Sequence, residues 1–144
     1  MKNHKSLEFY RPDTLGTSSF PIVEEGIAAG FPSPAEDFKQ PRISLDKELI
    51  DHPEATFFAR VRGDSMINAG LADGDLLVID KSLEPVHDKI AVCFIDGEFT
   101  VKRLNITSEG LFLAPENDHY HPIKVTEDNE LVIWGIVIYV VKKV

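Results

Sequence analysis

Residues 90–104 read IAVCFIDGEFTVKRL, two apolar runs separated by the pair Asp96-Gly97. An Asp-Gly pair between apolar runs is typical of a two-residue β-hairpin turn, because both central residues must adopt positive φ. The stretch therefore predicts a strand over Ile90–Ile95, a tight turn, and a returning strand over Glu98–Leu104. This hairpin is the clearest local signal in the chain.

Further β-forming runs lie on both sides of the hairpin. Thr56–Val61 is rich in aromatic and β-branched residues, and the short apolar run Asp75–Asp80 follows an Asp-Gly turn. Leu111–Ala114 predicts another short strand. Leu131–Val141 is nearly continuous in apolar β formers and predicts one buried strand that is bulged or broken near Gly135. Several short strands with little helix predict a mainly-β domain.

The first 41 residues differ from the remainder of the chain. Five of the nine prolines fall here, and proline fixes φ and removes a backbone donor. We therefore expect residues 1–41 to form a flexible, extended and mostly irregular N-terminal arm, with a linker over Arg11–Ser19. A β-rich domain over residues 42–144 follows it. Capping residues predict a short helix over Ser33–Gln40, and Leu45–His52 predicts a helical turn or two.

The charge balance limits the partners of the chain. Its 144 residues carry 15 Lys and Arg against 24 Asp and Glu, a formal net charge of −9. Binding to a nucleic-acid backbone depends on Lys and Arg that displace counterions, so direct DNA binding is not expected. The single cysteine, Cys93, excludes an internal disulfide. No apolar stretch approaches the roughly 20 residues that cross a bilayer and no export signal is recognised, so we expect a soluble cytoplasmic protein.

Lys102 is the first candidate for chemistry. Counting back from the turn pairs it with Ala91 and places it on one face with Cys93, Thr100 and Leu104. Burial on such a small apolar face disfavours the ammonium form and lowers the lysine pKa. To act as a base at neutral pH, that pKa must fall from about 10.4 toward 7, which corresponds to about 4 kcal/mol. The alternative is a lysine that extends from an edge strand into solvent.

Ser65 is the second candidate, in the sequence Gly63-Asp64-Ser65-Met66 directly after the predicted strand Thr56–Val61. A serine on a glycine turn can present its hydroxyl beside unpaired backbone N–H groups, which is the arrangement of a nucleophile with an oxyanion hole. The alternative is a serine that only caps a helix or shapes a turn.

Histidine and cysteine give weaker candidates. His119 and His121 would share one face of a strand, with Asp118 nearby, and such a pair could hold a metal ion for a metal-dependent hydrolase; the alternative is a pair of surface-loop histidines. Cys93 lies among apolar residues, which favours a buried inert thiol over a nucleophile. We expect neither a metal nor a cofactor.

Four motifs follow one another along the chain: GFPSPA at residues 30–35, GDSM at 63–66, DGD at 73–75 and GEFTVK at 97–102. In this order they resemble the LexA-like self-cleaving serine peptidases, and among these the UmuD type of the SOS response. The resemblance extends from about Ala28 to the C-terminus. It implies a β domain of the kind that LexA and the signal peptidases share.

The resemblance also implies a Ser/Lys dyad and a substrate. Ser65 would be the nucleophile, Lys102 the neutral general base, and the backbone N–H groups of Asp64 and Ser65 the oxyanion donors. The bond cut would be the chain's own Ala29-Gly30, which leaves 144 − 29 = 115 residues. The local sequence suits this role, because two alanines fit a tight pocket and a glycine bends without a Cβ clash.

The partners also come from the resemblance. Cleavage in the family is stimulated by the RecA–single-stranded-DNA filament, the shortened form joins a UmuC-type translesion DNA polymerase, and both forms are usually homodimers. The roughly 29 residues before the bond cannot build the helix-turn-helix domain of LexA, and the membrane anchor of a signal peptidase is missing. The alternatives are a polymerase-binding module that does not cleave itself and a LexA-like transcriptional regulator without its DNA-binding half.

Overall fold

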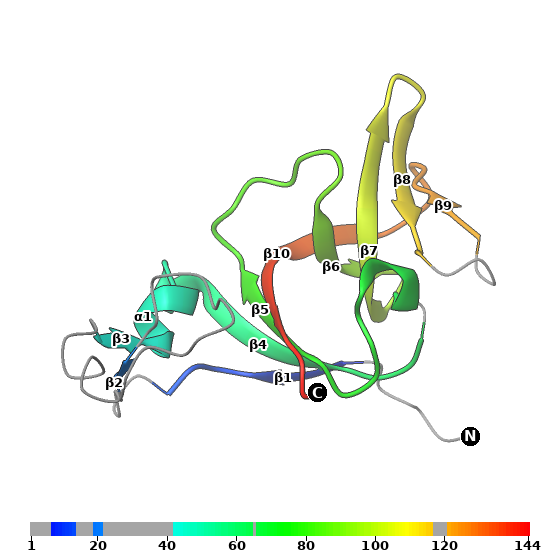
Figure 1. Ribbon diagram of the computed structural model, residues 1–144. Helices are drawn as coiled ribbons and strands as arrows, with labels where there is room; N and C mark the ends of the chain where they lie inside the picture. The colour runs from blue at the N-terminus through cyan, green and yellow to red at the C-terminus, as the bar shows by residue number, and fades with distance from the viewer. Residues whose placement is uncertain (1–6, 14–18, 22–41, 65, 117–120) are drawn as a thin grey trace.

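The computed structural model describes residues 7–13, 19–21, 42–64, 66–116 and 121–144, and it shows a mainly-β protein (Figure 1). Eight strands form one curled sheet in which every neighbouring pair is antiparallel. Their order across the sheet is β1 (Leu7–Tyr10), β4 (Thr56–Val61), β5 (Leu76–Asp80), β10 (Leu131–Val141), β6 (Ile90–Ile95), β7 (Glu98–Thr107), β8 (Gly110–Ala114) and β9 (Ile123–Lys124). The mainly-β fold predicted from the sequence is confirmed.

A smaller unit precedes strand β4. Strands β2 (Ser19–Pro21) and β3 (Arg42–Ser44) form a separate two-stranded sheet, which leads into helix α1 (Leu45–Leu49) and the 3₁₀ turn η2 (Pro53–Ala55). Helix α1 confirms the helical turn predicted over Leu45–His52, and it ends before His52 because the residue preceding a proline disfavours the α conformation. The helix predicted over Ser33–Gln40 lies outside the described residues.

The central hairpin has the predicted register. Ala91 pairs with Lys102 and Phe94 with Phe99, and the turn residues Asp96 and Gly97 have φ of 47° and 88°. Positive φ at both positions is what a two-residue hairpin turn requires. Strand β7 continues past the predicted end at residue 104, because the turn at residues 108–109 folds β8 back onto it.

Strand β10 crosses the middle of the sheet and pairs with both β5 and β6. Its register shifts between Ile133 and Gly135, which confirms the irregularity predicted there, and again between Val137 and Tyr139. A Cβ added at Gly135 would lie 2.5 Å from Cγ2 of Ile79, so only glycine lets the two strands approach this closely.

Apolar side chains cover both faces of the hairpin. Val92 and Val101 join one buried cluster, which also contains Leu7 and Met66. On the opposite face, a second cluster is formed by Ala91, Cys93, Ile95, Leu104, Leu113 and Ile136. Because side chains alternate along β7, Lys102 lies on the face of this second cluster.

Candidate active site

Lys102 is a buried lysine on an apolar face. Only 8% of the residue is exposed, and it lies opposite Ala91 on the face that also carries Cys93 and Leu104. Burial disfavours the ammonium form and lowers the Lys102 pKa, although the nearby Cys93 acts in the opposite direction. Among the described residues, no carboxylate forms an ion pair with this lysine. Of the two alternatives that the sequence left open, the structure therefore favours the buried lysine over one that extends from an edge strand into solvent.

Cys93 is the residue next to Lys102 on this face. Its side chain is fully buried, and its Sγ lies 3.9 Å from the carbonyl oxygen of Ala91. Burial raises the pKa of the Cys93 thiol to about 11, against a smaller lowering by the Lys102 charge. A thiol that stays protonated at neutral pH is a poor nucleophile. Cys93 is therefore the buried, inert thiol that the sequence predicted.

Strand β8 ends one position short of Lys102. The β7–β8 register pairs Arg103 with Ala114, the last residue of β8, and Pro115 follows. Proline has no N–H to donate to a ladder, which suits the end of a strand. Lys102 therefore lies one residue beyond the β7–β8 pairing, so no residue of β8 pairs with it.

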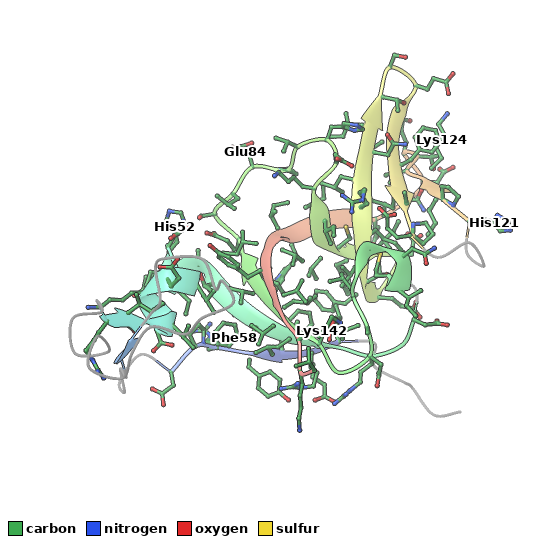
Figure 2. All side chains as sticks on the ribbon, viewed as in Figure 1. His52, Phe58, Glu84, His121, Lys124 and Lys142 are labelled. Carbon is green, nitrogen blue, oxygen red and sulfur yellow. The ribbon has the colours of Figure 1, made fainter. Side chains whose placement is uncertain are left out.

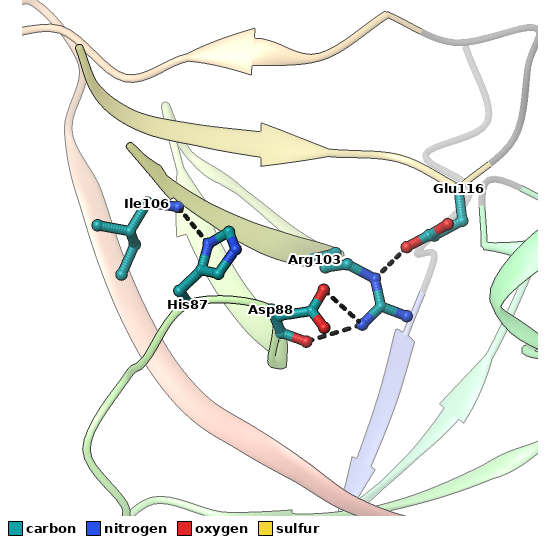
Figure 3. A network of polar contacts seen from close by, with 5 residues as sticks. All are labelled: His87, Asp88, Arg103, Ile106 and Glu116. Atoms are coloured by element: carbon teal, nitrogen blue, oxygen red, sulfur yellow. Dashed lines mark hydrogen bonds and ion pairs between the residues drawn. The ribbon is translucent and has the colours of Figure 1, made fainter. Parts of the chain in front are cut away.

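Arg103, the next residue, points to the opposite face and anchors the neighbouring loops (Figure 3). Its guanidinium donates to the Asp88 carbonyl oxygen at 2.7 Å and to the Glu116 carboxylate. Asp88 has a φ of 72°, and the adjacent His87 accepts the backbone N–H of Ile106 on Nδ1 at 3.0 Å. These contacts fix two loops against β7 and so hold the strand that carries Lys102.

The turn that carries Ser65 is described on both sides of the serine, but Ser65 itself lies outside the described residues. Gly63 has a φ of 99°, and its N–H donates to Oδ1 of Asp73 at 3.1 Å. Met66 is 2% exposed, and its carbonyl oxygen accepts the N–H of Leu71 at 3.1 Å. The GDSM and DGD motifs, 10 residues apart in sequence, thus form two turns bound to each other.

Asp75, the last residue of the DGD motif, ties this pair of turns to the C-terminal segment. It is 4% exposed and accepts the Ala72 N–H at 2.8 Å and the Lys142 ammonium at 2.5 Å. Burial alone would raise the Asp75 pKa, but these two donors outweigh it and hold the pKa below its usual value. The sequence analysis missed this pair, which joins residues 67 positions apart.

The serine turn and the lysine hairpin share one part of the core. Met66, directly after Ser65, belongs to the same buried cluster as Val92 and Val101, which lie on the strands that carry Ala91 and Lys102. This cluster covers the face of the hairpin opposite to the one that carries the Lys102 side chain. The distance between Ser65 and Lys102, the oxyanion site and the Ala29-Gly30 bond all involve residues outside the described ranges. These parts of the site stay predictions.

The metal-binding alternative is only partly covered by the structure. His121 is exposed and lies on the other side of the molecule from His52, while His119 lies outside the described residues (Figure 2). Within the described ranges, no three His, Cys, Asp or Glu side chains are grouped so that they could hold a metal ion. In the same ranges, no helix is long and apolar enough to span a membrane.

Residues 21–138 match the protein family described as peptidase S24-like. The chain belongs to this family. Among its curated relatives of UmuD type, protein MucA of Salmonella typhimurium is 42% identical over 120 residues, which cover 83% of this chain and 82% of MucA. Protein ImpA of Shigella flexneri is 39% identical over 141 residues, 96% of each chain. The LexA repressor of Shewanella sp. (strain ANA-3) is 35% identical over 126 residues, 87% of this chain and 60% of LexA.

Membership of the S24-like family confirms the resemblance inferred from the four motifs. The family is one of serine peptidases of the self-cleaving kind, and the relatives place this chain among the UmuD-type proteins of SOS mutagenesis. The β sheet described above is the LexA-like fold of the S24 family.

Proposed function

We propose that this S24-like chain cleaves its own Ala29-Gly30 bond with Ser65 as nucleophile and Lys102 as general base. The observation that carries the proposal is the buried, apolar setting of Lys102 in a chain of this family. Lysine, unlike arginine, can lose its proton when it is desolvated, and a neutral amine can accept the proton of a serine hydroxyl.

The reaction has two steps. Neutral Lys102 takes the proton of Ser65 Oγ while Oγ attacks the Ala29 carbonyl carbon, and the backbone N–H groups of Asp64 and Ser65 stabilise the oxyanion. The protonated lysine then donates its proton to the Gly30 nitrogen as the peptide bond breaks, which leaves residues 1–29 as an ester on Ser65. Lys102 next deprotonates a water molecule that hydrolyses the ester and restores the serine.

Control of this reaction matters more than its speed, because the bond and the dyad belong to one molecule or one dimer and their effective concentration is high. In our proposal a RecA–single-stranded-DNA filament favours the conformation in which the cleavage segment lies across the dyad. It shifts the population toward a pre-existing state, as a ligand with unequal affinity for two states does.

The shortened chain then acts as a homodimeric, cytoplasmic accessory subunit of a UmuC-type translesion polymerase. The similarity to MucA and ImpA over most of the chain supports this role. With a net charge of −9, we expect the chain to meet DNA through its partners and not by direct binding.

Incubation of the purified chain from pH 7 to pH 10.5, with the fragments separated on a gel, tests the proposal. High pH removes the proton from Lys102, so it should replace the filament and increase the rate of cleavage. Ser65→Ala should abolish cleavage, while the matched control Ser108→Ala, at an exposed turn, should cleave like the wild type. A chain that stays intact at every pH would favour the polymerase-binding module without self-cleavage.

A further inference from the structure

Strand β1 lies upstream of the bond that we propose to be cleaved, yet it completes the sheet that lies downstream. It is the terminal strand of the eight, and all four of its residues pair with β4, from Leu7 opposite Val61 to Tyr10 opposite Phe58 (Figure 1). Strand β2, also upstream of the bond, pairs with β3. Cleavage at Ala29-Gly30 would therefore leave the first 29 residues attached through non-covalent contacts alone.

The inward side chains of β1 fill a defined site. Leu7 is 5% exposed within the main core cluster. The Phe9 ring lies with its centroid 4.8 Å from that of Phe99 on β7 and 4.8 Å from that of Trp134 on β10. The edge of β4 supplies the backbone partners, and these two aromatic rings supply the wall of the site.

The outward side chains of β1 make weaker contacts. Glu8 is about half exposed and forms an ion pair with Arg62 at 3.5 Å, and it accepts a hydrogen bond from the Tyr10 hydroxyl at 2.9 Å. Tyr10 is 46% exposed. Exposed ion pairs contribute little to affinity, so the site selects chiefly by its two inward apolar positions, which are two residues apart.

We propose that the edge of β4, with Phe99 and Trp134, is a strand-docking site that self-cleavage makes available to a protein partner. The partner supplies an extended segment with a large aliphatic residue and, two positions later, an aromatic residue, as Leu7 and Phe9 do now. Backbone hydrogen bonds to an open sheet edge and pockets for alternate side chains are the usual means of such strand addition.

This inference rests on the proposed self-cleavage, which supplies the switch. While the chain is intact, β1 is tethered to the domain, and short tethers give effective concentrations of about millimolar. After cleavage this advantage is lost, and the released segment keeps its place only through non-covalent contacts, chiefly those of β1 with β4 and of β2 with β3. A partner segment can then compete for the site, and an unpaired β4 edge is itself prone to accept another strand.

A titration tests the site without depending on cleavage. Trp134 is the only tryptophan of the chain and contacts Phe9, so its fluorescence reports on the occupant. In the full-length Phe9→Asp variant the chain's own strand should no longer fill the site. A synthetic peptide of residues 4–13 should then change the Trp134 emission saturably, and the intact wild-type chain should respond at least about tenfold more weakly, because its site is occupied.

Two matched peptides separate docking from non-specific binding. The peptide with Phe9→Ala should bind about tenfold more weakly, because an aromatic anchor is lost, while the peptide with the outward change Tyr10→Ala should bind nearly as well as the original. If Phe9→Asp does not fold, as judged by its circular dichroism, the milder Phe9→Ala takes its place. Equal binding of all three peptides, or no emission change in the variant that folds, would overturn the docking site.

The same titration on the self-cleaved wild-type chain tests the switch. The cleaved chain should respond to the peptide at a concentration at least about tenfold lower than the intact chain does. Equal responses from cleaved and intact chains would overturn the release of the site by cleavage. If the chain never cleaves itself, the proposed function fails, whereas the titration of the Phe9→Asp variant still decides whether the site accepts a strand.

Discussion

Replacement of Lys102 by methionine should stabilise the folded chain at neutral pH. The residue is 8% exposed, and its burial lowers the pKa of the amine from the ordinary 10.5. A lysine of lowered pKa binds its proton more weakly in the folded chain than in the unfolded one. At any pH at which the unfolded lysine is charged, this difference lowers the free energy of unfolding. Methionine has a similar length and no charge to desolvate.

The size of this effect depends on pH in a defined way. Between the folded pKa of Lys102 and 10.5, the unfolded wild-type chain holds one proton more, and its free energy of unfolding rises by about 1.4 kcal/mol per pH unit relative to the variant. The stability advantage of Lys102→Met should therefore be largest at and below the folded pKa of Lys102, and it should shrink as the pH rises from there toward 10.5. Cys93 has the opposite effect: its pKa is raised from 9.0 to about 11, so the folded thiol keeps its proton where the unfolded one loses it, and the stability of both chains falls as the pH rises above about 9.

Urea denaturation of both chains at pH 6, 7, 8, 9, 10 and 10.5 measures the difference. The exposed Lys143→Met serves as the matched control and should show no pH-dependent gain. A Lys102→Met chain that is less stable than the wild type at pH 7, or a difference that stays constant up to pH 10.5, would refute the argument that desolvation lowers this pKa.

Three further changes test the fold. Gly135→Ala should lower the free energy of unfolding by about 1–3 kcal/mol, because the added Cβ would lie 2.5 Å from Cγ2 of Ile79. Gly97→Ala should lower the free energy of unfolding by about 1 kcal/mol, because φ is 88° at this turn position and a side chain is strained there. His52→Ala should destabilise the chain more at pH 5.5 than at pH 8. The hydrogen bond to Asp80 raises the His52 pKa. The stabilisation that protonated His52 contributes is therefore complete below about pH 6.5, and it is lost as the pH rises through the raised pKa.

Chemical denaturation checks all three changes. The two glycine predictions fail if the denaturation midpoints equal that of the wild type. For His52→Ala, the exposed His121→Ala is the control, and a loss of stability that is equal at the two pH values would contradict a proton-linked contact with Asp80.

The sequence predicted the parts of the fold that depend on neighbouring residues. The hairpin register followed from Asp96-Gly97, and the face shared by Lys102 and Cys93 followed from the register. Glycine within an apolar run was enough to predict the irregularity of β10 near Gly135.

Contacts between distant segments were not predicted. Strand β1 has only four residues, and no local sequence pattern relates it to its partner, β4, about 50 positions later in the chain. The Asp75–Lys142 pair likewise joins residues that no local pattern relates. The same limit applies to the dyad, because spacing in sequence does not decide whether Ser65 reaches Lys102.

The masses of the fragments formed by the full-length chain test the central claim most directly. After incubation with the RecA–single-stranded-DNA filament, or at alkaline pH without it, mass spectrometry should find two products of 29 and 144 − 29 = 115 residues. Neither Ser65→Ala nor Lys102→Ala should form them. Fragments that end elsewhere than at Ala29, or undiminished cleavage in either variant, would contradict a Ser65/Lys102 self-cleaving peptidase.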